Sequence, residues 1–142
     1  MATEVKESFS VSDADKAWGV ISDVNTLIPC VPGAKVTSAA SATKADAEIA
    51  VDMGSMSMTF SGPVEIAEQD EGSKKVVVKA NAKEASGQSN AEGTVTITVG
   101  GGDGSVEGSA NVSGKASSMG EGTIKAVLTQ LVQQFGANLS KA

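Results

Sequence analysis

The chain has 142 residues and a net charge of −6, which suits one domain built around a single hydrophobic core. It contains no His and no Arg, and its aromatic residues are three Phe and one Trp. These absences exclude a Ser-His-Asp triad and a His-ligated metal. The acidic charge and the shortage of stacking groups argue against nucleic-acid binding.

The single cysteine, Cys30, excludes an intrachain disulfide and favours a reducing compartment. The first residues lack the basic and apolar segments of a signal peptide. No stretch approaches the roughly 18 apolar residues of a membrane span. We therefore expect a cytoplasmic protein.

The N-terminal third predicts one strand followed by two helices. Residues 4–11 alternate between apolar and polar side chains, which indicates a half-buried strand. Ser12 is expected to cap a helix of about three turns, whose apolar stripe ends near Ile21. A second helical piece over 24–28 should stop at Pro29, because proline disfavours the helical conformation in the residue before it.

The rest of the chain predicts an antiparallel meander closed by a long helix. Short glycine-bearing turns separate six expected strands, at 34–41, 44–53, 55–68, 74–84, 89–99 and 105–116. Ser118 and Glu121 form a capping-box pattern before an amphipathic helix that extends past Phe135. This order predicts an α+β helix-grip, or START-like, fold in one domain spanning residues 1–142. A curved sheet of about seven strands would wrap around the C-terminal helix.

The inward face of this sheet is predicted to be apolar and poor in side-chain volume. Small residues recur on neighbouring strands, as at Ala80, Gly93 and Ala110, which favours a cavity beneath the last helix. The alternative is a helix packed closely on a flat sheet. No ionisable side chain is expected to point inward between residues 44 and 112, so the cavity should bind apolar matter without transforming it.

The expected ligand-binding residues come from the proline corner, the inward strand faces and the last helix. They are Leu27, Ile28, Val31, Met53, Met56, Met58, Phe60, Val78, Ala80, Val95, Ile97, Ala110, Val112, Met119, Ile124, Val127, Leu128 and Leu131. No catalytic or metal-binding residue is predicted.

The mouth of the cavity is expected where alternate connections of the meander meet. Strand parity gathers the segments 29–33, 54–55, 85–89 and 114–122 at one end of the domain. Flexible methionines in these segments suit variable apolar partners. Cys30 lies in the proline corner and is expected to be a buried small side chain rather than a reactive thiol, because no His or Arg is present to lower its pKa.

Three segments of the chain form a recognisable combination: Leu27-Ile-Pro-Cys-Val-Pro-Gly33, the glycine turn and Phe-x-Gly strand within Val51–Gly62, and the ending from Val112 through Gly120 to Phe135. Together they resemble the CoxG family of carbon monoxide dehydrogenase subunits, within the START-like (SRPBCC) superfamily. The chain departs from the family pattern at Ala34, where a second Cys is common, and at Ser55, where Pro is common.

The resemblance implies an accessory protein rather than a catalyst. Its partners would be carbon monoxide dehydrogenase and the inner face of the cytoplasmic membrane, with which it would associate peripherally. Combined with the apolar cavity, it suggests a carrier that takes a respiratory quinone of the menaquinone type, or another isoprenoid lipid, between bilayer and enzyme. No catalytic cofactor is implied.

Two other functions remain open, the first of them on the strength of the same resemblance. The first is a structural adaptor with a filled interior that recruits the dehydrogenase to the membrane without a ligand. The second is an enzyme of the cyclase or hydrolase kind, which the lack of inward acids and bases disfavours.

Overall fold

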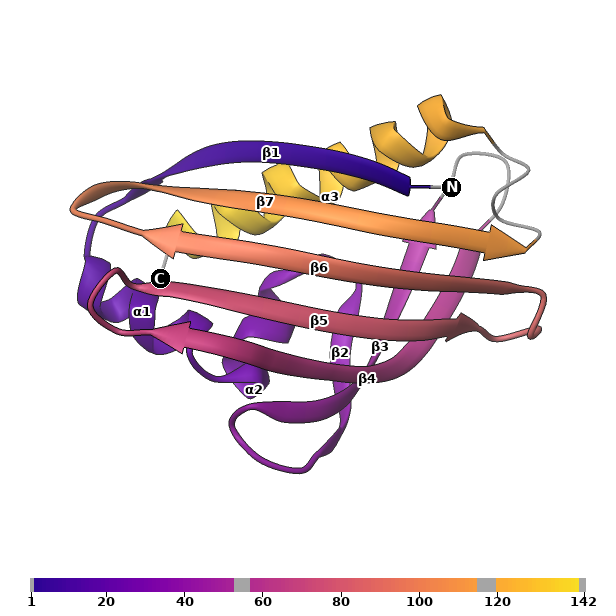
Figure 1. Ribbon diagram of the computed structural model, residues 1–142, viewed down its shortest axis with the longest axis horizontal. Helices are drawn as coiled ribbons and strands as arrows, with labels where there is room; N and C mark the ends of the chain where they lie inside the picture. The colour runs from indigo at the N-terminus through magenta and orange to yellow at the C-terminus, as the bar shows by residue number, and fades with distance from the viewer. Residues whose placement is uncertain (1, 53–56, 115–119, 141–142) are drawn as a thin grey trace.

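Seven antiparallel strands form one curved sheet in the order β1-β7-β6-β5-β4-β3-β2 (Figure 1). The computed structural model describes residues 2–52, 57–114 and 120–140. The strands are β1 (Ala2–Val11), β2 (Ala34–Ala39), β3 (Lys44–Asp52), β4 (Ser57–Asp70), β5 (Lys75–Glu84), β6 (Ser89–Val99) and β7 (Gly102–Gly114). All six pairings are antiparallel, as the short connections predict.

The helices lie on the concave side of the sheet. Two short ones, α1 (Ala14–Ile21) and α2 (Val24–Leu27), lead through the 3₁₀ turn η1 (Ile28–Cys30) from one edge strand to the other. The long helix α3 (Glu121–Ser140) crosses behind the sheet in Figure 1. The helix-grip fold predicted from the sequence is confirmed.

The first helix starts one residue later than predicted, with Asp13 rather than Ser12 as its N-cap. Asp13 has an extended backbone, and its carboxylate accepts hydrogen bonds from the N–H groups of Asp15 and Lys16, at 3.1 and 3.2 Å. Both Ser and Asp can cap a helix, so the identity of the cap depends on where the backbone turns from extended to helical.

The second α-helix ends before Pro29, at Leu27 rather than at the predicted residue 28. The chain continues through Pro29 as η1, with proline in the first turn, where its missing N–H is not needed.

At the other end of the chain, the expected capping residue Ser118 lies outside the described residues. Within them, the carbonyl of Gly120 accepts the first hydrogen bond of α3, from the N–H of Ile124.

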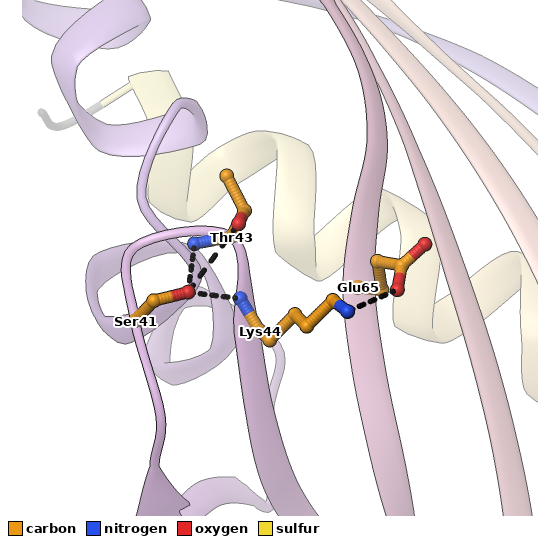
Figure 2. Close-up of polar contacts among 4 residues, drawn as sticks. All are labelled: Ser41, Thr43, Lys44 and Glu65. Atoms are coloured by element: carbon orange, nitrogen blue, oxygen red, sulfur yellow. Dashed lines mark hydrogen bonds and ion pairs between the residues drawn. The ribbon is translucent and has the colours of Figure 1, made fainter.

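The outward face of the sheet carries polar, exposed side chains. The turn between β2 and β3, together with the neighbouring strand β4, gives an example. Ser41 Oγ accepts from the N–H groups of Thr43 and Lys44, both at 3.2 Å (Figure 2). Lys44 Nζ lies 3.6 Å from the Glu65 carboxylate on β4, its direct cross-strand partner. Both side chains are well exposed, so this ion pair contributes little stability.

The C-terminal half of α3 is anchored tightly to β1. Phe9 lies between two glycines: a Cβ on Gly104 of β7 would come within 2.6 Å of its ring, and a Cβ on Gly136 of α3 within 3.1 Å of its own Cβ. Ser140 Oγ also donates to the carbonyl of Ser10 at 2.6 Å, and the Gln133 amide donates to Glu7 at 3.3 Å. The helix therefore packs mainly on β1 and makes few contacts with β7.

The hydrophobic core is divided into two clusters. The larger one surrounds α1, α2 and the end of α3, with Ile21, Val24 and Leu139 nearly inaccessible to solvent. The smaller one includes Phe60, Val112 and Ile124 near the start of α3. One compact sheet-on-helix interior would ordinarily give a single contiguous cluster, so the division indicates unfilled space between them.

Replacing Asp13 with Ala should lower the free energy of unfolding by about 1 kcal/mol, because two N–H groups at the start of α1 lose their acceptor. Urea denaturation measures the change. Ser12→Ala is the matched control and should leave the midpoint unchanged. Equal losses in the two variants would show that Asp13 is not the cap.

Candidate functional site

An apolar cavity of about 330 Å³ lies between the sheet and α3, and it is partly open to solvent. Its walls combine residues of both core clusters, such as Leu27 and Phe135 from the larger and Phe60 and Val112 from the smaller. The volume is roughly twice that of an engineered apolar cavity that binds benzene. It is therefore large enough for a fused ring system or a short isoprenoid segment.

The cavity exists because one row of the sheet has almost no side chains. Direct cross-strand partners run from Val64 to Ala80, Gly93 and Ala110, one residue on each of the strands β4, β5, β6 and β7. All four line the cavity. A Cβ placed on Gly93 would meet nothing nearer than the Ser109 carbonyl oxygen at 3.5 Å. The backbone ladder is intact along this row, so the void comes from missing side chains.

Most of the expected ligand-binding residues do surround this cavity, although whether they bind a ligand stays a prediction. Met58 does not line it and belongs instead to the smaller core cluster. Met53, Met56 and Met119 lie outside the described residues. The predicted residues that line the cavity are Leu27, Ile28, Val31, Phe60, Val78, Ala80, Val95, Ile97, Ala110, Val112, Ile124, Val127, Leu128 and Leu131.

Several further lining residues were not among those predicted. Val5 of β1 and Ile49 of β3 lie on inward faces that strand alternation does reveal. Val132 and Phe135 continue the helical stripe of α3 by one further turn. The pattern identifies these faces, but it does not tell how far along α3 the void extends.

The proline corner does not lie at the expected end of the domain. Two of the connections expected at that end do meet there, because Ser89 at the start of β6 pairs with Gly114 at the end of β7. In contrast, the Cys30 carbonyl accepts a hydrogen bond from Asn138 at 2.7 Å. Asn138 is 17 residues after the first residue of α3, about 25 Å along the helix axis. The prediction considered only which strand ends face the same way, and not where along its neighbour each strand begins. β2 starts opposite Ile49, about 10 Å before the end of β3.

The charged residues near the cavity point away from it or are already engaged. Glu48 and Glu92 border it, but both occupy outward positions of the pleat. Glu84 is an exception to the predicted uncharged inward face, because it lies opposite Phe60 at the end of β5. Its carboxylate accepts hydrogen bonds from the N–H and the hydroxyl of Ser86 in the following turn. Acid–base chemistry needs a titratable group within reach of the substrate, and among the described lining residues no titratable side chain occupies an inward position.

Cys30 packs against the larger core cluster beside the cavity-lining Val31 and is half-buried. Its thiol lies 3.5 Å from the Thr26 carbonyl oxygen. Burial raises the pKa of the Cys30 thiol, because the thiolate loses solvation. The residue is therefore a weak nucleophile at neutral pH.

Solved structures share this architecture at low sequence identity. A conserved protein from Geobacillus kaustophilus superposes with a TM-score of 0.75 at 15% identity, covering 99% of this chain and 93% of its own. The Zhui aromatase/cyclase from Streptomyces sp. R1128 gives 0.64 at 11%, with coverage of 99% and 93%. A truncated norcoclaurine synthase from Thalictrum flavum gives 0.59 at 15%, with coverage of 99% and 92%. These similarities define a START-like helix-grip fold and nothing more specific.

The family profile is more informative. The profile of CoxG, a subunit of carbon monoxide dehydrogenase, matches residues 8–142, nearly the whole chain. The protein belongs to the CoxG family. A comparison with curated proteins gives no significant match.

Among the described helices, none combines the length and the hydropathy needed to cross a bilayer.

Alkylation of Cys30 should be slow at neutral pH and should accelerate only at a pH above the pKa of an ordinary cysteine, because the thiol is protonated until then. The rate of iodoacetamide labelling, followed against pH by mass spectrometry, measures this midpoint. The same measurement in denaturant provides the reference. A folded midpoint equal to or below the denatured one would contradict the effect of burial.

Replacing Ala80 with Phe should destabilise the protein much less than the same change at Ala45. Both residues lie on the inward face and flank Val64 in one cross-strand row. Ala80 lines the cavity, whereas Ala45 is buried in the larger core cluster and does not. Overpacking at Ala45 should cost about 1–3 kcal/mol. Denaturant midpoints compare the two variants, and equal losses would show that no space lies above Ala80.

Proposed function

We propose that this protein is a non-enzymatic carrier of an apolar, lipid-like molecule, and that its ligand is a respiratory quinone of the menaquinone type. The observation that carries the proposal is the apolar cavity of about 330 Å³ beneath α3. An interior that serves only as a structural adaptor gains nothing from a void of this size, because unfilled space forfeits packing energy. The cavity therefore favours a carrier over an adaptor.

The energetics of burial suit such a ligand. Each buried CH₂ group contributes about 0.8 kcal/mol, so one five-carbon isoprene unit gains up to about 4 kcal/mol before the costs of association. A fused ring with one or two isoprene units matches the available volume. A longer tail would extend through the open side of the cavity.

Family membership supplies the second half of the proposal. An accessory protein of carbon monoxide dehydrogenase that carries a quinone would connect the enzyme to an electron acceptor that is confined to the bilayer. The protein would associate peripherally with the inner face of the cytoplasmic membrane, collect the quinone, and deliver it to the dehydrogenase. In this role it supplies binding and transport, and the enzyme supplies the chemistry.

Extraction from vesicles tests this function. The protein is incubated with phosphatidylglycerol vesicles that contain a menaquinone, separated by sedimentation, and examined by native mass spectrometry. We expect a one-to-one complex with wild type and a strongly reduced fraction with Ala80→Phe, which fills the cavity. Lys79→Gln, at the neighbouring outward position, is the matched control and should extract as wild type does. A wild-type protein that remains free of quinone would refute the carrier function and support the adaptor.

A further inference from the structure

Gly93 and Gly108 are glycines that the backbone of the sheet does not require. Neither has a positive φ. A Cβ on Gly93 would meet nothing nearer than the Ser109 carbonyl oxygen at 3.5 Å. A Cβ on Gly108 would meet nothing nearer than Val5 Cγ2 at 3.6 Å. Both are ordinary van der Waals distances, so alanine fits at either position. Glycine inside a strand weakens it, because it costs backbone entropy and offers no side chain to pack.

Two other glycines of the sheet do have a structural reason. A Cβ on Gly62 would collide with the Asn81 carbonyl oxygen. A Cβ on Gly104 would come within 2.6 Å of the Phe9 ring. The pair described above lacks such a close neighbour, and both of its members line the cavity. Their missing side chains therefore leave cavity space, and the reason for these two glycines lies in what occupies that space.

Gly93 lies at the centre of a shallow basin in the cavity floor. Its direct cross-strand partners are Ala80 on β5 and Ala110 on β7. On all three strands, the inward residues two positions before and two positions after this row also line the cavity. The patch is about 10 Å across the strands and about 13 Å along them. Its bulkier side chains all stand on the perimeter, at Val78, Val95 and Val112.

The long helix supplies the wall that faces this basin. The polar contacts of α3 with β1 at Glu7 and Ser10 fix the helix alongside this strand. With about 1.5 Å per helical residue against about 3.3 Å per strand residue, the same spacing places Leu128 level with Val5. Val5 is the direct cross-strand partner of Gly108, and all three residues line the cavity. A molecule over the basin is therefore held between the sheet and an apolar side chain of the helix.

A planar fused ring uses this shape better than a flexible chain does. A flat ring that lies parallel to the sheet touches the bare centre and the raised perimeter at once, and every contact adds dispersion energy. A hydrocarbon chain can follow a groove between side chains and gains nothing from a hollow at Gly93. Among the described lining residues, no polar side chain occupies an inward position. The ring is therefore recognised by its face rather than by its oxygen atoms.

We infer that the basin centred on Gly93 seats a planar two-ring system face-on, and that Gly93 is the residue that makes the cavity specific for a ring over an open chain. This inference rests on the proposed carrier function and specifies which part of the ligand is recognised and where. The ring covers the row from Ala80 to Ala110, and the hydrocarbon tail leads toward the open side of the cavity.

The test compares two ligands that have the same number of carbon atoms. One is geranyl naphthoquinone, which carries a fused ring, and the other is geranylgeraniol, which is an open chain. Each is loaded into phosphatidylglycerol vesicles and incubated with the protein. After sedimentation of the vesicles, chromatography of the supernatant gives the partition of the ligand between protein and bilayer.

Two variants each add one carbon atom to the cavity wall. Gly93→Ala adds it at the centre of the basin. Val64→Ile is the matched control, because Val64 lines the cavity in the same cross-strand row but lies on β4, outside the basin. A difference between the two variants therefore reports the position of the added carbon and not the loss of volume.

For Gly93→Ala we expect a loss of about tenfold in the partition of the naphthoquinone into the protein, because the added methyl group overpacks the ring contact. The partition of geranylgeraniol should stay nearly unchanged, and so should that of both ligands in Val64→Ile. Without ligand, Gly93→Ala should unfold at a denaturant concentration equal to or above that of wild type, because its Cβ meets no close neighbour.

Nuclear Overhauser contacts in the wild-type complex with geranyl naphthoquinone locate the ring directly. The ring protons should give contacts to the α-protons of Gly93 and Gly108. Contacts to these α-protons from the geranyl chain alone would overturn the placement of the ring.

An equal loss for both ligands in Gly93→Ala, or an equal loss in Val64→Ile, would overturn the role of Gly93, because either result reflects reduced volume alone. Unchanged partition of the naphthoquinone in Gly93→Ala would overturn it as well, and so would a lower stability of this variant without ligand. Each of these results leaves the carrier function standing as long as wild type extracts both ligands. A wild-type protein that extracts neither ligand would contradict the carrier function itself.

Discussion

The close packing of Phe9 between two glycines determines where α3 can lie. Gly104 and Gly136 leave room for the aromatic ring on one side and for the helix backbone on the other. This contact, with the hydrogen bond from Ser140 to Ser10, fixes the C-terminal half of the helix against an edge strand rather than over the middle of the sheet. The first half of α3 then projects over strands that have little side-chain volume to meet it. The cavity follows from this placement.

The division of the core into two clusters follows from the same arrangement. The larger cluster surrounds α1, α2 and the end of α3, and it supplies most of the buried hydrophobic residues. The smaller cluster closes the other end with Phe60, Val112 and Ile124. The cavity lies between the two clusters and takes wall residues from both, so a ligand that occupies it adds dispersion contacts to each.

The fold was largely predictable from the sequence, because pleated strands with one face toward a core reveal themselves by alternation. The small residues Ala80 and Ala110 indicate a cavity by their type and spacing alone. Features that depend on distant partners were not predictable. The prediction for the proline corner was wrong because the offset between β2 and β3 is a property of the pairing, with Ala34 opposite Ile49.

Two local details show the same limit. Ser12 and Asp13 are both competent caps, and the extended backbone at Asp13 decides between them. Thr3 lay outside the strand inferred from alternation, which began at residue 4. In the structure β1 begins at Ala2, and its pairing with β7 already includes Thr3, opposite Ala110.

A cavity whose floor is made of absent side chains has a consequence for evolutionary divergence. The strand pairing along Val64, Ala80, Gly93 and Ala110 is made by the backbone, so it tolerates a change of side chain at these positions, proline excepted. Single substitutions there can enlarge, shorten or divide the binding space while the sheet keeps its register. Ligand preference can therefore change in small genetic steps without a passage through unfolded intermediates. Such a scaffold can persist at sequence identities as low as the 11–15% that separate this chain from its structural neighbours.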